Sequence, residues 1–305
     1  MTVSECVGCS LIAFGPSLAA FWLTVAGEPS RIIVFLLSAF FWLLSLLPSS
    51  IAWSLLEALF GTQLPVGVVT SVCFQECFRF LAFRTLRKAE TVLSIVELVG
   101  GDDDVALSRY RTAFSYVSGL GFGAASAASS MLNLLADAAA GPGTSHLKEM
   151  IWKHRGNVIY LSHRESSAAP SKSAAGTPGF LGEESRVNYV LYSATAAAFS
   201  LLHTLWSVVA FNALLFRRWC LLLFVPAAHL FASCSTTLSQ HAHQDDRYAL
   251  VPVATVATVL CLSTVTAFST AGGSLRSLAA CLIGLVSTAS VPGSPEAVKP
   301  QEQRR

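Results

Sequence analysis

Charged residues are scarce in this chain. Asp, Glu, Lys and Arg make up 12% of its 305 residues and hydrophobic residues make up 53%, whereas roughly a quarter of a soluble protein is charged. The formal net charge is only +2, and the basic residues lie between apolar runs rather than along one stripe. Because nucleic-acid binding depends on a concentrated basic surface, this composition excludes nucleic acid as a partner and indicates an integral membrane protein in a lipid bilayer.

Recognisable metal-binding patterns are also missing. The cysteines lie inside or beside apolar runs, and no histidine pair accompanies them at a spacing that suits a metal. We interpret the cysteines as small buried hydrophobic side chains and predict no metal site and no cofactor. The eight residues are Cys6, Cys9, Cys73, Cys77, Cys220, Cys234, Cys261 and Cys281.

What the chain does have is a series of long apolar runs. Each is long enough, at 1.5 Å per residue, to cross about 30 Å of hydrocarbon as a helix. The sequence therefore predicts an all-α membrane protein with seven transmembrane helices. The runs cover residues 7–26, 32–56, 64–83, 116–137, 187–216, 219–239 and 250–271.

The composition divides the chain into four parts. Residues 1–143 hold the first four predicted spans, and residues 187–276 hold the last three. Residues 144–186 are polar and include a low-complexity stretch, which predicts a partly disordered lumenal insertion. Residues 277–305 are expected to form a cytosolic tail.

The lysines and arginines predict the orientation in the membrane. One set of connecting segments carries many of them, including Arg31, Arg84, Arg217 and Arg218, whereas the short segments of the opposite set hold only Arg247. Cytoplasmic loops are enriched in basic residues. We therefore expect a lumenal or extracellular amino terminus and a cytosolic carboxyl terminus.

Small residues recur every fourth position in the fourth span. Gly119, Gly123 and Ala127 would share one face of a helix, and that face has almost no side chain beyond the backbone. In lipid, such a strip lets another helix approach closely. The pattern predicts a helix-packing or assembly surface, whose occupant is either a partner protein or another helix of the same bundle.

Four ionisable residues lie within the predicted spans, and each is a functional hypothesis because a charge at membrane depth is costly. Glu76 and Arg79 are three residues apart and so share a helix face. We interpret them as a structural ion pair whose long side chains extend toward the nearby cytosolic end.

The other two are His203 and His229, in the fifth and sixth spans. These spans are joined by a very short turn, so the depths of the two histidines differ by only about 5 Å and they can meet. They could form a polar pair around a water-filled cavity or a partner's chain end, or each could be neutral and bonded to a backbone carbonyl or a serine. Periodicity does not determine whether they face each other.

Several stretches together resemble the anterior pharynx-defective (Aph) subunit family of γ-secretase. The resemblance implies a seven-span, noncatalytic scaffold of that intramembrane aspartyl protease, in endoplasmic reticulum, Golgi and plasma or endosomal membranes. Such a subunit would stabilise nicastrin and presenilin, contact the presenilin enhancer subunit, and support cleavage of type I membrane proteins. The resembling stretches are residues 8–16, 24–33, 39–43, 75–80, 116–123, 201–206 and 270–277.

The resemblance extends to individual residues. Gly119 and Gly123 match the family's glycine zipper, with Ala127 in place of the third glycine, and His203 and His229 match its two intramembrane histidines, which are associated with assembly and activity around presenilin. The polar insertion after Gly143 is a departure from the family.

The competing hypothesis is a metal-dependent intramembrane hydrolase that acts alone through Glu76, Arg79, His203 and His229. A catalytic metal normally needs three protein ligands and an open position, and the sequence has neither a Glu-Glu nor a His-x-x-x-His pair. Asp137 is isolated at the end of a span, so a presenilin-like pair of intramembrane aspartates is missing as well. A transporter is a weaker alternative because no inverted repeat is evident.

Overall fold

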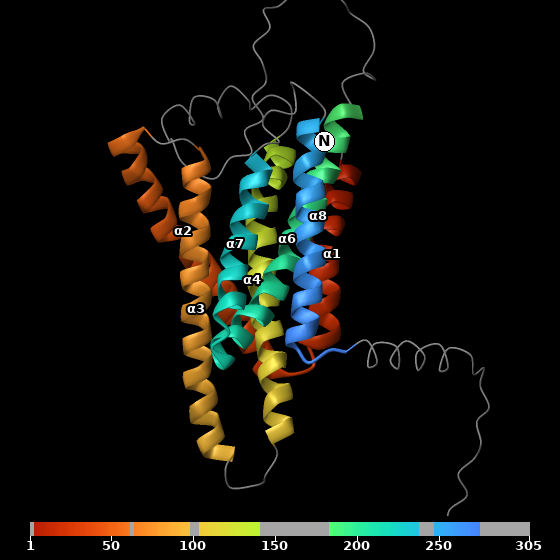
Figure 1. Ribbon diagram of the computed structural model, residues 1–305. Helices are drawn as coiled ribbons and strands as arrows, with labels where there is room; N and C mark the ends of the chain where they lie inside the picture. Colours follow the sequence, from red (N-terminus) through yellow and green to blue (C-terminus); the bar gives the residue numbers. More distant parts are fainter. Residues whose placement is uncertain (1–2, 62–63, 98–103, 141–182, 238–246, 275–305) are drawn as a thin grey trace, which may run out of the picture.

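The computed structural model describes residues 3–61, 64–97, 104–140, 183–237 and 247–274, and these form seven helices (Figure 1). No strand occurs in this part of the chain. The predicted all-α, multi-pass membrane fold is therefore confirmed. The helices are α1 (Val3–Thr24), α2 (Pro29–Phe60), α3 (Leu64–Glu97), α4 (Asp104–Ala140), α6 (Glu183–Phe216), α7 (Trp219–Thr236) and α8 (Arg247–Thr270).

Six of the described helices are long and apolar enough to cross a membrane. The seventh, α4, is rich in glycine, serine and alanine, and it packs against α1, α2 and α6. Because its middle faces other helices rather than lipid, α4 does not need the hydropathy of the other spans. Small side chains there allow close packing instead.

Two helices are longer than their apolar runs. The predicted third span ends at residue 83, but α3 continues to Glu97, and α4 begins at Asp104, well before residue 116. Both extend past the other helices at the lower end of the bundle in Figure 1. The reason is that an apolar run marks the part of a helix in lipid, whereas charged and polar residues outside it continue the helix in water.

The short connection between α1 and α2 is held by one arginine. Pro29 is the first residue of α2, where its missing N–H costs no hydrogen bond. Arg31 forms an ion pair with Glu28 at 2.8 Å and donates from Nη1 to the carbonyl oxygen of Thr24 at 2.7 Å. A carbonyl at the end of α1 is thereby satisfied, and the chain reverses direction at this connection.

The connection between α6 and α7 is equally short. Arg217 has a φ of 53°, in the left-handed region, and the next N–H, that of Arg218, donates to the carbonyl oxygen of Ala213 at 2.9 Å. This closure ends α6 and lets α7 begin at Trp219. The two helices contact each other, as expected for antiparallel neighbours.

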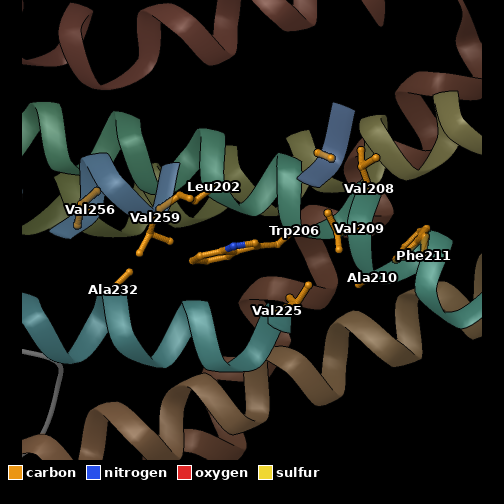
Figure 2. Packing of buried hydrophobic residues seen from close by; sticks show 11 residues of the cluster. Leu202, Trp206, Val208, Val209, Ala210, Phe211, Val225, Ala232, Val256 and Val259 are labelled. Carbon is orange, nitrogen blue, oxygen red and sulfur yellow. The ribbon is translucent and has the colours of Figure 1, made fainter. Parts of the chain in front are cut away.

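Helix α6 is the centre of the bundle. Of its apolar segment, 56% is buried, against 17% to 28% in the other five candidate spans. It contacts α1, α4, α7 and α8. Figure 2 shows Trp206 of α6 lying in the space between α6 and α7, with Val225 and Val259 near it. Functional side chains on α6 are therefore held away from lipid.

Two predicted parts of the chain lie mostly or wholly outside the described residues. These are the polar insertion at 144–186, of which only the last four residues are described, as the first turn of α6, and the tail at 277–305. Both assignments stay predictions.

Candidate functional site

The small-residue face of α4, defined by Gly119, Gly123 and Ala127, lies against α6. A Cβ added to Gly119 would come within 2.7 Å of the Thr204 Cα, and one added to Gly123 would collide with the carbonyl oxygen of Ser200. Ala127 is fully buried. Of the two occupants that the sequence left open, a helix of the same bundle covers this face in the described structure.

A third glycine, on the opposite side of α4, was not identified from the sequence. A Cβ at Gly121 would collide with the carbonyl oxygen of Phe35 and lie 3.2 Å from the backbone nitrogen of Ala39, both on α2. The signal was present in the spacing Gly119-x-Gly121-x-Gly123, since residues two apart lie on opposite sides of a helix. Helix α4 is thus packed closely on two sides.

Glu76 and Arg79 form the predicted ion pair. Arg79 donates from Nε to Glu76 Oε2 at 3.0 Å and from Nη2 to Glu76 Oε1 at 3.2 Å. The expected extension of Arg79 toward the membrane surface is wrong, because only 2% of its side chain is exposed. Its third nitrogen, Nη1, donates to the carbonyl oxygen of His203 at 3.1 Å and to Ser207 Oγ. The guanidinium therefore points into the bundle and binds α6.

The two histidines face each other. Their ring centroids are 5.0 Å apart, the ring planes are nearly perpendicular at 88°, and the residues are 1% and 2% exposed. His203 Nδ1 lies 2.9 Å from Arg79 Nη2, and His229 Nδ1 lies 2.7 Å from Glu76 Oε1. The Nδ1 atom of each ring is thus bonded to a charged side chain rather than to a backbone carbonyl or a serine.

Glu76, Arg79, His203 and His229 thus form a single polar network, which joins α3, α6 and α7. The sequence located all four residues but treated them as an ion pair and a separate histidine pair. A buried charge pair is tolerated only when further hydrogen bonds satisfy its remaining donors and acceptors. Here the histidines, a serine and a backbone carbonyl provide those bonds.

Aromatic rings enclose the polar network. Trp206 lies 5.6 Å from the His203 ring and 4.6 Å from the His229 ring, and its Nε1 donates to Ser263 Oγ of α8 at 3.0 Å. The ring of Phe122, on α4, lies 5.0 Å from the Arg79 Cζ. These rings exclude lipid, and they link the network to two further helices.

Sequence reasoning did not single out Trp206, Ser207 or Phe122. Trp206 and Ser207 lie three and four residues after His203, the spacing of neighbours on one helix face, so the signal was available for them. Phe122 had no comparable signal, because its contact depends on how α4 is rotated against α3.

The chemistry of this network favours a structural role over metal binding. No three His, Cys, Asp or Glu side chains are grouped as metal ligands among the residues that the structure describes. Both carboxylate oxygens of Glu76 and one nitrogen of each histidine are engaged, and the positive guanidinium lies among them. A divalent cation would have to displace Arg79, so the geometry does not support the hydrolase hypothesis.

Comparisons with known proteins agree with the resemblance. A family model described as Aph-1 protein matches residues 4–274. The γ-secretase subunit Aph-1 of Drosophila melanogaster is 36% identical over 277 residues, which cover 91% of this chain and 97% of the relative. The γ-secretase subunit Aph-1b of Danio rerio is 37% identical (92% and 94% covered), and the subunit APH-1B of Homo sapiens is 34% identical (93% and 95% covered). Since both kinds of match extend over nearly the whole chain, the protein belongs to the Aph-1 family.

Proposed function

We propose that this chain is the Aph-1 subunit of a γ-secretase complex, where it acts as a noncatalytic scaffold. The observation that carries this proposal is the match over residues 4–274, with relatives that are themselves named γ-secretase subunits. The polar network supports it, because the ionisable residues within the spans bind each other across three helices. They make a rigid core for a scaffold rather than an open catalytic site.

The proposed partners are presenilin, nicastrin and the presenilin enhancer subunit, in endoplasmic reticulum, Golgi and plasma or endosomal membranes. In this assembly the chain stabilises presenilin and nicastrin and so supports the cleavage of type I membrane proteins. The small-residue face serves assembly indirectly. By holding α4 against α6, it sets the shape of the bundle surface that the partners contact.

The test is affinity purification of the tagged chain in mild detergent from cells that express all four proteins. We expect presenilin and nicastrin to co-purify and the isolated chain to have no proteolytic activity. A tagged variant with Gly123→Leu is the matched control, and it should recover less of both partners. A pure chain that cleaves a membrane substrate by itself would support the hydrolase instead.

We also propose that the amino terminus is lumenal or extracellular and the carboxyl terminus cytosolic. The α1–α2 and α6–α7 connections lie at the same end of the bundle as the end of α8 (Figure 1). Arg31 is in the first turn of α2, and Arg217 and Arg218 form the α6–α7 connection. The positive-inside rule assigns that end to the cytosol and the 144–186 insertion to the lumen.

Glycosylation tests this orientation. A sequon placed near Met1 should be glycosylated, whereas one placed after Pro292 should not, because the modifying enzyme acts only in the lumen. Endoglycosidase sensitivity on gels measures the result. The opposite pattern would invert the proposed orientation.

A further inference from the structure

The two buried histidines use the same ring atom to bind opposite charges. His203 Nδ1 lies 2.9 Å from Arg79 Nη2, and His229 Nδ1 lies 2.7 Å from Glu76 Oε1. A guanidinium has only donors, whereas an ionised carboxylate has only acceptors. The direction of each hydrogen bond is therefore determined by the partner, even though a histidine nitrogen can take either role.

His203 must accept the hydrogen bond from Arg79. Its Nδ1 then holds a lone pair, and the ring proton is on Nε2. A proton on Nδ1 would point at the guanidinium N–H and break the bond. The contact of Arg79 Nη1 with the His203 carbonyl oxygen, at 3.1 Å, fixes the guanidinium against the same residue.

His229, in contrast, must donate its hydrogen bond. Its Nδ1 must donate to Glu76, so that nitrogen carries a proton. A second proton, on Nε2, would make the ring cationic and leave the network with net positive charge, because Glu76 and Arg79 already cancel. An uncompensated charge is costly at a site where the side chain is 2% exposed.

We propose that Arg79 and Glu76 hold the two histidines in opposite neutral tautomers, His203 protonated on Nε2 and His229 protonated on Nδ1. Arg79 is the positioning residue for His203, and Glu76 is the positioning residue for His229. These proton positions are set by contacts within the chain, whether or not it assembles with partners.

The opposite tautomers determine which hydrogen bonds the two Nε2 atoms can form. The ring atoms left over are one N–H donor, on His203, and one lone pair, on His229. A neutral acceptor therefore suits His203, and a neutral donor suits His229. A divalent cation does not suit the pair, because His203 has one nitrogen engaged by Arg79 and a proton on the other.

Nitrogen NMR of the imidazole rings tests the proposal, since it identifies which ring nitrogen carries the proton. The sample is the full chain in detergent micelles, labelled with ¹⁵N-histidine. The other five histidines, which lie outside the described residues, are replaced by glutamine. They are His146, His154, His163, His241 and His243.

We expect one signal set for an Nε2-protonated ring and one for an Nδ1-protonated ring. His203→Gln assigns them by removing the first set. Two rings with the same tautomer, or either ring as a cation, would overturn the proposal. Loss of the His203 Nε2 proton on addition of zinc chloride at neutral pH would also contradict it, because zinc would then have bound through a lone pair on that ring.

Substitution of Arg79 separates a positioning role from a merely structural one. Arg79→Met removes the donor, so His203 should change from one tautomer to a mixture while His229 stays protonated on Nδ1. Arg79→Lys still has only donors and should keep the His203 proton on Nε2. Arg84→Met, at an exposed position of the same helix, is the matched control and should change neither ring.

If Arg79→Met does not fold, the wild-type spectrum and Arg79→Lys still decide the proposal. A single unchanged His203 tautomer in folded Arg79→Met would show that Arg79 does not position that ring.

Discussion

Two neighbouring regions hold helix α6 in different ways. The small-residue face of α4 approaches the α6 backbone so closely that there is no room for one more carbon at Gly119 or Gly123. The polar network instead binds α6 to α3 and α7 through charged side chains. The regions meet at Ser207, which accepts from Arg79 and would lie 2.8 Å from a Cβ at Gly119.

The two regions are disrupted by opposite kinds of substitution. In lipid the hydrophobic effect hardly favours contact between helices, so close packing must supply the attraction. The packing of the α4 face against α6 is therefore disrupted when an atom is added. The polar network is destabilised when a group is removed, because a buried charge is left without its partner.

Arg79→Met should have the largest effect. It leaves the Glu76 carboxylate, which is 16% exposed, without its cation, and breaking a buried pair in this way costs up to about 3–5 kcal/mol. We expect a large fall in the melting temperature of the purified chain in detergent and a loss of partner recovery. Arg84→Met, which removes an exposed arginine from the same helix, should have little effect.

A double variant sharpens this prediction. Glu76→Gln combined with Arg79→Met removes both charges, and glutamine can still accept a hydrogen bond from His229. The double variant should therefore melt at a higher temperature than Arg79→Met alone. If it melts at the same or a lower temperature, the cost does not come from an unpaired charge.

Gly123→Leu should have the next largest effect. Even its Cβ would collide with the Ser200 carbonyl oxygen, so α4 and α6 must separate, and overpacking of this kind costs about 1–3 kcal/mol. Blue-native gels at matched expression should show reduced complex assembly. Ala127→Leu, at a buried position of the same face, should also reduce assembly. Ala128→Leu changes the next residue, which is exposed, and should not reduce assembly. Equal assembly of all three variants would contradict the close approach.

The smallest effect is expected from removing a hydrogen bond between two neutral side chains outside both regions. Ser38 Oγ of α2 donates to Ser118 Oγ of α4 at 2.8 Å. Hydrogen bonds between membrane helices contribute about 0.6 kcal/mol on average. A double-mutant cycle with Ser38→Ala and Ser118→Ala, read by thermal unfolding in detergent, should give a coupling of this size. A coupling free energy as large as that between Arg79 and Glu76 would contradict the expectation that neutral contacts contribute less than charged ones.

The two regions also differ in how far the sequence predicted them. Spacing alone placed Glu76 beside Arg79 and put Gly119, Gly123 and Ala127 on one face, because positions along one helix are determined by its period. The depth of the two histidines followed from the short turn between their helices. The contact of Arg79 with His203, and of Glu76 with His229, did not follow, because it depends on the rotation of α3 about its own axis.

By itself, the sequence determined that this protein is a multi-helix membrane protein and which of its polar residues lie within the spans, because run length and hydropathy report directly on the lipid environment. Only the tertiary structure decided that α6 covers the small-residue face and that four ionisable residues form one network. Those facts depend on which helices become neighbours and which faces they turn toward each other, and periodicity within a single helix contains no information about either.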